Sequence, residues 1–312
     1  MKIFNDFSLI ANIPNPVLTI GTFDGVHIGH QKIIKQLNEE AKKIGGESVL
    51  FTFFPHPRMV LSPENHGLKL IQSQEEKLEK LAHIGLQNCI VYPFTEEFSQ
   101  LTAFEFVRDF LVKQLKVKKL VIGYDHQFGK NREGSISYLK TVSKEFNFDV
   151  IEIPAQEIDE VNVSSTKIRD AILKGEIELA NEFLGAPFQL SGKVVKGKAL
   201  GRTIGYPTAN IEMNSELKLI PAKGVYAIKV FVKGGWYGGM LNIGFRPTIS
   251  EESNQTIEVH IFDFTDNIYG ENITVQFLSK WRDEMKFNGV EELKNQLKKD
   301  EEIIRHIVAD FI

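Results

Sequence analysis

Residues 17–30 read VLTIGTFDGVHIGH, an apolar run followed at once by glycines and histidines. The run at 17–20 is typical of a strand buried in a parallel sheet. Glycines at 21, 25 and 29 allow the backbone to approach a ligand closely, and a helical pattern begins at about His30. Because the N-terminus of a helix attracts anions, the stretch predicts a phosphate-binding strand–turn–helix unit in an open α/β sheet.

His27 and His30 are the side chains in this turn that can carry chemistry. Their spacing matches neither the G-x-G-x-x-G of dinucleotide-binding proteins nor a P-loop, because no Gly-Lys-Ser/Thr follows. Two histidines three residues apart could ligate a metal, but no nearby cysteine or third histidine completes a zinc set. We expect them to hydrogen-bond phosphate oxygens; the alternative is a pair of surface imidazoles beside a tight turn. Asp24 either contacts the ligand or caps the turn.

Outward from this unit, short apolar runs alternate with amphipathic segments, which predicts parallel β-α-β units. The expected strands are 17–23, 48–54, 89–94, 119–124 and 149–154, and the expected helices are 30–45, 72–85, 103–115 and 135–146. A helical pair at 165–176 and 177–185 follows.

The sequence pattern changes near residue 186. From there, short runs rich in Gly, Val, Ile and Tyr, separated by turn signals, predict an antiparallel β-barrel. The tail at 290–312 has the pattern of an amphipathic helix that docks on this barrel. With 312 residues, the chain is long enough for two cores, so we expect domains at 1–185 and 186–312.

The composition of the chain limits which kinds of partner it can bind and in which compartment it is expected. The net charge of −4 and the interleaved lysines of VKQLKVKKL (112–120) argue against nucleic acid. Cys89 is the one cysteine, lies in an apolar run and suits a reducing compartment. Asp6 interrupts any leader-like run, and no stretch approaches the roughly eighteen apolar residues that cross a membrane. We therefore expect a cytoplasmic protein without a membrane partner.

A second candidate site lies in GKALGRTIGYPTAN (197–210). Its glycines at 197, 201 and 205, with Lys198 and Arg202, predict a flexible flap that carries cations. The Thr208 hydroxyl and the Asn210 amide oxygen are hard oxygen ligands, which suit Mg²⁺ bound to a nucleotide.

The stretch TIEVHIFDF (256–264) adds an acid to this site. Strand alternation places Ile257, Val259 and Ile261 on one face and Glu258 with His260 on the other. Glu258 is then either a general base for a hydroxyl proton or an exposed strand residue.

These stretches resemble a known family. GTFDGVHIGH is similar to the G-x-F-D-G-V-H-x-G-H signature of the adenylyltransferase module in bacterial bifunctional riboflavin kinase/FAD synthetases. FTFFPHPRMV (51–60), VIGYDHQFGKNREG (121–134) and NVSSTKIRDAILKGEIELANEFLG (162–185) match the same family in order. The resemblance implies a Rossmann-like nucleotidyltransferase domain.

The resemblance also implies ligand contacts in the first domain. Those for ATP are Gly21, Phe23, Asp24, Gly25, His27, His30, Ser164, Ser165, Thr166 and Arg169. Those for flavin are Phe54, His56, Pro57, Arg58, Asp125 and Phe128. From the residues alone, His56 could instead belong to a rigid structural loop, and Arg169 could be an ordinary surface charge. Relatives often carry an aromatic residue where this chain has His126, which puts one flavin or adenine contact in doubt.

The second half resembles the riboflavin kinase domain through GKALGRTIGYPTAN, NIGFRPT (242–248), TIEVHIFDF and FLSKWRDEMKF (277–287). This resemblance implies ATP contacts from Gly197, Lys198, Gly201, Arg202, Gly205, Thr208 and Asn210, with Mg²⁺ on Thr208 and Asn210. It implies flavin contacts from Asn242, Arg246 and Arg282, the last on or beside a helix.

We therefore expect ATP-dependent phosphorylation of riboflavin to FMN, then adenylylation of FMN to FAD, with Glu258, His27 and His30 as catalytic residues and Mg²⁺ as the metal. Riboflavin, FMN and ATP are the expected partners of a monomer or weak homo-oligomer. Two alternatives remain. One is a chain with kinase activity alone, and the other is a flavin-sensing or RNA-binding regulator, which the acidic balance disfavours.

Overall fold

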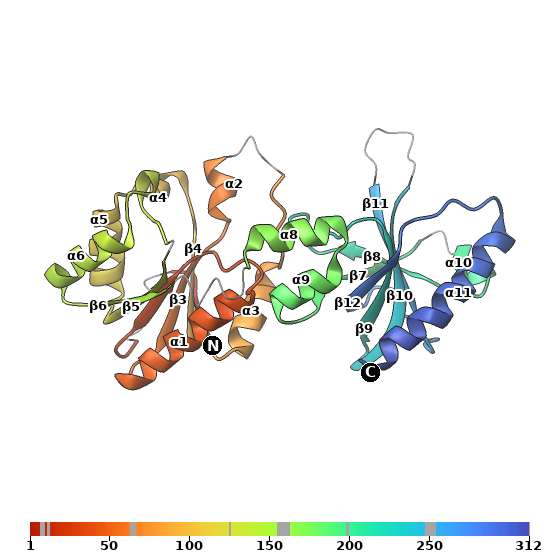
Figure 1. Ribbon diagram of the computed structural model, residues 1–312, viewed down its shortest axis with the longest axis horizontal. Coiled ribbons are helices and arrows are strands. Elements are labelled where there is room, and N and C mark those ends of the chain that lie inside the picture. Colours follow the sequence, from red (N-terminus) through yellow and green to blue (C-terminus); the bar gives the residue numbers. More distant parts are fainter. Residues whose placement is uncertain are drawn as a thin grey trace. The chain divides into compact units, whose positions relative to one another are not determined.

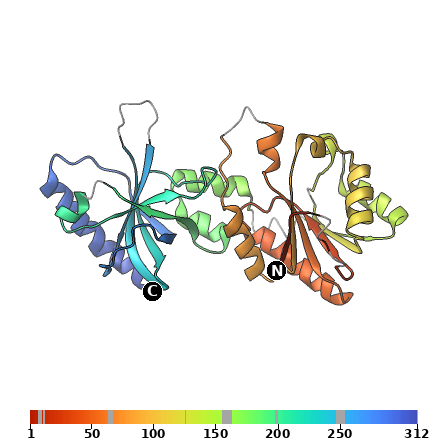
Figure 2. The same ribbon diagram turned by 180° about the vertical axis from the view of Figure 1, so that it is seen from behind.

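The computed structural model describes residues 1–6, 10, 13–62, 67–124, 126–154, 163–197, 200–246 and 254–311. It divides into two compact units, residues 1–165 and 166–312. Figures 1 and 2 show the elements of each unit from opposite sides.

The first unit is built on a six-stranded parallel sheet, which confirms the expected open α/β architecture. The strand order is β1-β4-β3-β2-β5-β6. The strands are β1 (Lys2–Phe4), β2 (Val17–Ile20), β3 (Ser48–Phe53), β4 (Asn88–Tyr92), β5 (Lys119–Gly123) and β6 (Asp149–Ile153). The chain runs from β2 outward to β4 and returns to β5 on the other side of β2. The turn after β2 therefore stands at the switch point, where open α/β sheets bind ligands.

Helices cover both faces of this sheet. They are α1 (Ile28–Lys43), α2 (Pro57–Leu61), α3 (Gln74–His83), α4 (Glu96–Ser99), α5 (Ala103–Glu105), a π-helical continuation (Phe106–Gln114), a short 3₁₀ turn (Lys130–Arg132) and α6 (Ile136–Phe146). A capping box starts α3, with the Ser73 hydroxyl and the Glu76 carboxylate each bonding the other's backbone amide. α6 ends where Asn147 adopts the left-handed conformation.

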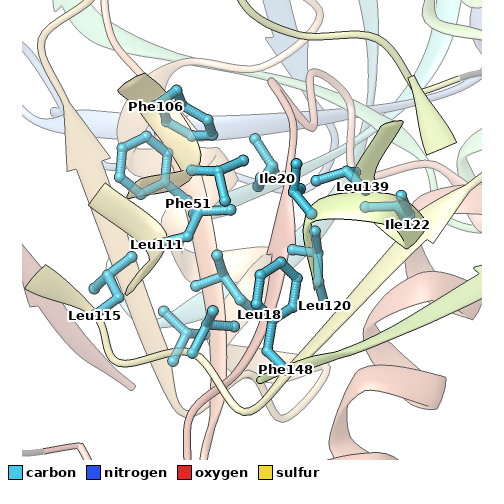
Figure 3. Packing of buried hydrophobic residues seen from close by; sticks show 14 of the residues in the cluster. Leu18, Ile20, Phe51, Phe106, Leu111, Leu115, Leu120, Ile122, Leu139 and Phe148 are labelled. Atoms are coloured by element: carbon cyan, nitrogen blue, oxygen red, sulfur yellow. The ribbon is translucent and has the colours of Figure 1, made fainter. Parts of the chain in front are cut away.

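The core of the first unit lies in two layers, because successive residues of the inner strands point to opposite faces. Leu18 packs with Phe51, Phe106 and Leu139 on the face that the π-helical segment Phe106–Gln114 and α6 cover (Figure 3). Val17 packs with residues of α1 and α3 on the opposite face, together with the buried thiol of Cys89. Burial on both faces explains why these strands read as continuous apolar runs.

The second unit contains a closed antiparallel barrel in the order β10-β11-β8-β7-β12-β9, as expected. Its elements are α8 (Ser165–Lys174), α9 (Ile177–Leu184), β7 (Phe188–Val195), α10 (Leu200–Thr203), β8 (Ala209–Met213), β9 (Gly224–Val232), β10 (Gly235–Arg246), β11 (Asn254–Ile261), β12 (Asn272–Arg282) and α11 (Val290–Ala309).

Side-chain bonds fix helices to the barrel. Asn181 of α9 donates to the carbonyl of Phe277 (2.8 Å) and accepts from the amide of Phe188 (2.7 Å). α9 therefore packs with the barrel, whereas the boundary expected from sequence lies after it, at 185/186. α11 docks through Ile304 and Val308, which join the core cluster of the barrel.

Candidate active sites

The turn after β2 has an unusual backbone. Phe23, Gly25 and Val26 adopt positive φ angles of 51°, 88° and 38°. The buried carboxylate of Asp24 accepts the backbone amide of Ile71, with the two oxygens at 3.1 and 3.2 Å. Asp24 thus ties the turn to the segment before α3.

His27 and His30 stack on each other at the start of α1. Their ring centroids are 3.6 Å apart with an interplanar angle of 18°, and Phe23 stacks on His30 at 4.4 Å. The Nδ1 of His27 accepts the His30 amide at 3.3 Å, so the neutral ring carries its hydrogen on Nε2. The buried Nδ1 of His30 has no hydrogen-bond partner among the residues that the structure describes.

Both imidazoles are neutral at neutral pH. Burial, with a smaller contribution from nearby Lys80, lowers the pKa of His27 to about 4. Burial and the neighbouring His27 lower the pKa of His30 well below its usual value. The neutral pair can therefore donate hydrogen bonds to phosphate oxygens, but it supplies no fixed positive charge.

Two lysines of α3 supply positive charge near this turn, and the sequence motifs predicted neither of them. Lys77 is buried, with its Nζ 3.4 Å from the carbonyl of Thr22, and the Nζ of Lys80 lies 3.5 Å from the carbonyl of Gly25. Burial lowers both pKa values, that of Lys80 to about 8. In QEEKLEKLAH the alternating charges look like a solvent-exposed helix face, so the pattern alone carried no signal.

The second phosphate-binding stretch reaches the same turn. The Ser165 hydroxyl donates to the carbonyl of Asp24 at 2.9 Å, and exposed Ser164 directly precedes it. Thr166 and Arg169 lie on α8, in the second compact unit.

The flavin candidates of the first unit lie on two loops. Phe54 is 40% exposed after β3, while the Nδ1 of His56 caps α2 by accepting the amide of exposed Arg58, with Pro57 in the first turn. In the second loop, Phe128 packs on Phe106 (5.6 Å between centroids) and His126 stacks on Phe128 at 5.9 Å. Asp125 lies outside the described residues.

In the barrel, three predicted residues occupy one cross-strand row. Glu258 of β11 pairs with Asn210 of β8 on one side and with Asn242 of β10 on the other. The Thr208 hydroxyl donates to Oε2 of Glu258 at 3.4 Å. Burial along β11 alternates as predicted, with Ile257 and Val259 buried and Glu258 and His260 half-buried.

Two cavities flank Thr208. The first, of about 230 Å³, is largely apolar with a few polar groups, as small-molecule sites are. Its walls include Tyr206, Thr208, Met240, Asn242, Glu258, His260, Arg282, Met285, Phe287, Leu293 and Leu297. The second, of about 420 Å³, is lined by Arg202, Pro207, Thr208, Ala209, Val259, Ile261, Phe264, Asp266, Ile268 and Tyr269, among others. The sequence pattern did not predict a site role for residues 265–269 or for α11.

The glycines of the flap allow close packing. A Cβ on Gly201 would lie 2.1 Å from the carbonyl oxygen of Tyr206, and one on Gly197 would lie 2.2 Å from Nδ2 of Asn210. Gly205 has a φ of 87°. Lys198 lies outside the described residues.

Arg282 ends the strand β12, so the expectation of a helix there was wrong. Its guanidinium forms a bidentate pair with buried Asp300 of α11, with Nη2 to Oδ2 at 2.6 Å. Trp281 also donates to Asp300, at 3.1 Å. Arg246 ends β10 opposite Asn254, and its side chain lies outside the described part.

Thr208 and Asn210 are the expected metal ligands, and both are half-buried. Their neutral oxygens, beside the carboxylate of Glu258, form a donor set that suits a hard cation which keeps water and phosphate ligands. Among the described residues, no group of three or more His, Cys, Asp or Glu could hold a metal by itself.

Comparison with known proteins matches both units. A family model for FAD synthetase matches residues 10–167, and one for riboflavin kinase matches residues 184–308. A curated bifunctional riboflavin kinase/FMN adenylyltransferase from Listeria monocytogenes is 42% identical over 295 residues, covering 95% of this chain and 93% of the relative. This chain belongs to that bifunctional family.

Further relatives of the riboflavin kinase/FMN adenylyltransferase family agree. The proteins of that name from Haemophilus influenzae (40% identity, 91% of this chain and 92% of the relative) and Bacillus subtilis (37%, 93% and 92%) also match along the chain. A solved structure described as a macrolide-efflux protein from Streptococcus pneumoniae has a TM-score of 0.88 at 36% identity, over 97% of this chain and 98% of its own. That description names a different activity, which fold likeness alone does not transfer. No helix within the described ranges is long and apolar enough to cross a membrane.

Proposed function

We propose that this chain phosphorylates riboflavin to FMN with ATP and then adenylylates FMN to FAD, releasing pyrophosphate. The observation that carries the proposal is the match of one family model to each half of the chain, with a polar site in each half. In the barrel, the row of Asn210, Glu258 and Asn242 supports the kinase step.

In the kinase step, Glu258 accepts the proton of the riboflavin 5′-hydroxyl. The 5′-oxygen forms a bond to the γ-phosphorus of ATP while the bond from that phosphorus to the β,γ-bridging oxygen breaks, and ADP leaves. Thr208 and Asn210 would hold Mg²⁺, which neutralises phosphate charge. The flap glycines and the cations Lys198 and Arg202 close over the phosphates.

The two cavities suit the two substrates of this step. The apolar cavity beside Glu258 suits the flat flavin ring, with Asn242 in its wall as a polar contact. From the family resemblance we also assign a flavin contact to Arg246. Since Asp300 engages the Arg282 guanidinium, we assign Arg282 a contact through its planar face. The larger cavity joins Arg202 and Thr208 to apolar walls, which suits a nucleotide.

In the adenylylation step, a phosphate oxygen of FMN forms a bond to the α-phosphorus of ATP while the bond to the leaving pyrophosphate oxygen breaks. The nucleophile is already an anion, so positioning and charge neutralisation carry the rate. His27 and His30 donate hydrogen bonds, and Lys77 and Lys80 add positive charge at the turn. Further ATP contacts come from Gly21, Phe23, Asp24, Gly25, Ser164, Ser165, Thr166 and Arg169. Flavin contacts come from Phe54, His56, Pro57, Arg58, Asp125 and Phe128.

We place the enzyme in the cytoplasm, because its one cysteine is buried and lies within a core rather than at a disulfide. We expect a monomer or weak homo-oligomer that binds no nucleic acid and no membrane. From the family resemblance we propose functional domains at 1–185 and 186–312, with α8 and α9 packed in the compact unit that contains the barrel.

The test is a time course of the purified chain with riboflavin, ATP and Mg²⁺, with the flavins separated by chromatography. FMN that rises first and FAD that follows would support both steps. FMN that accumulates without FAD would overturn the adenylyltransferase assignment and point to His126. FAD formed from added FMN, but no FMN from riboflavin, would overturn the kinase assignment. Excess chelator should stop both steps, and added Mg²⁺ should restore them.

A further inference from the structure

His260 makes a contact that the proposed reaction does not use. It lies on β11, two positions after Glu258, and both side chains are half-buried. Its Nδ1 is 2.8 Å from the carbonyl oxygen of Pro207. Since a carbonyl only accepts, the imidazole donates this bond, and in the neutral ring the hydrogen is on Nδ1.

The segment that His260 holds belongs to both barrel cavities. Thr208 lines the two of them, Pro207 lines the larger, and His260 lines the smaller. Tyr206 contacts the His260 ring at 5.2 Å between centroids, and Thr208 donates to Glu258. Two side chains of β11 thus hold the three consecutive residues from Tyr206 to Thr208: His260 contacts Tyr206 and Pro207, and Glu258 accepts from Thr208.

The hydrogen bond from Thr208 to Glu258 cannot persist during the proposed kinase step. Glu258 must turn an oxygen to the riboflavin hydroxyl, and Thr208 must turn its oxygen to the nucleotide side. The bond between them is already long, at 3.4 Å. The shorter bond from His260 to Pro207 involves no reacting atom, so it can persist while the other one opens.

We propose that His260 is a positioning residue of the riboflavin kinase site. By donating to Pro207, it keeps Thr208 in register with the nucleotide when Thr208 releases Glu258. This inference rests on the proposed function. Its effect falls on the productive binding of ATP rather than on the flavin, although His260 itself lines the flavin cavity.

Two substitutions separate the donor from the ring. His260→Asn puts an amide N–H near the position of Nδ1 but removes the ring, whereas His260→Phe keeps a ring and removes the donor. We expect His260→Phe to raise KM for ATP about three- to tenfold, the value of one hydrogen bond, with KM for riboflavin within about twofold. His260→Asn should keep KM for ATP within about twofold of the wild-type value.

The control on the same strand is Gln255→Ala, since Gln255 is exposed. FAD formation from added FMN is measured on every variant. An unchanged rate shows that the substitution has left the first unit folded and active. A raised KM for ATP in His260→Asn with none in His260→Phe, or no change in either, would overturn the inference. Failure of the proposed function would look different: the unaltered chain would form no FMN, or Glu258→Gln would form it at the wild-type rate.

Discussion

At the scale of single residues, the turn after β2 combines neutral imidazoles with buried lysines. The histidines were expected to meet phosphate charge, and their burial makes them hydrogen-bonding groups rather than cations. The positive charge comes from Lys77 and Lys80, which approach backbone carbonyls of the same turn. This division of roles has consequences for both stability and rate as the pH changes.

The stability of the first unit should fall as the pH drops from 7.5 to 5. The folded pKa of His27, about 4, is below the unfolded value of about 6.5, so the unfolded chain binds more protons in this window. The contribution of His27 is complete above pH 6.5 and decreases as the pH falls toward 4. Its loss by pH 5 is about 2 kcal/mol, and His30 acts in the same direction.

Thermal unfolding of the full chain at a series of pH values measures this effect. In His27→Gln, which cannot titrate, the slope between pH 7.5 and 5 should be shallower than in the wild type. Equal slopes in the two proteins would show that folding does not lower the pKa of His27.

The adenylyltransferase rate should decline above pH 8. Lys80, with a pKa of about 8, loses its charge there and no longer offsets the charge of the phosphates. Lys80→Arg should shift this decline to higher pH, and Lys80→Met should lower the rate near pH 7 and remove the decline above pH 8 that Lys80 causes. The measurement is FAD formation from added FMN between pH 7 and 9.5, with Lys42→Met, an exposed lysine, as the control. A decline that persists unchanged in Lys80→Arg would rule out Lys80 as its source.

At the scale of elements, the sequence predicted the inner strands and the long helices within a few residues, because apolar periodicity is strong there. It missed β1, whose three residues KIF are too few for a pattern. It also took Arg282 for a residue on or beside a helix, although β12 extends to it. The sequence placed Glu258 and His260 on one face, but the bond from His260 to Pro207 depends on loop closure, which no local pattern records.

The attachment of α11 to β12 depends on Asp300. This carboxylate is fully buried and accepts from Arg282, Trp281 and Gln296. Asp300→Asn leaves the Arg282 charge without its partner in a poorly solvated place, which should cost about 3 kcal/mol. Both tryptophans, Trp236 and Trp281, lie in the second unit, so their fluorescence during denaturation measures its unfolding. The exposed Glu302→Gln is the control, and equal stability of the two variants would contradict this role of Asp300.

At the scale of the whole molecule, the glycine turn with its histidines lies in the first compact unit and the barrel row lies in the second. The turn is at the switch point of a parallel sheet, and the row crosses three barrel strands. No residue is assigned to both proposed sites. If each works alone, FMN can leave one molecule and react on another.

A mixture of two variants, each impaired in one of the two steps, should therefore make FAD from riboflavin. Glu258→Gln removes the proposed base and should slow FMN formation at least about a hundredfold. A double variant, His27→Asn with His30→Asn, should form FMN but no FAD. Together they should form FAD after a lag, as free FMN accumulates. FAD from the unaltered chain but none from the mixture would mean that both sites must act within one molecule.

Because Cys89 is buried, its chemical labelling can measure how often the first unit unfolds locally. The thiol is fully buried in the first unit, and burial raises its pKa to about 12. In the folded state an alkylating reagent therefore cannot reach the sulfur, and the reactive thiolate is scarcely populated. Because the chain has one cysteine, the mass added by iodoacetamide would count only molecules whose first unit has opened. Labelling that slows when ATP is added would then measure nucleotide binding to this unit without any engineered probe.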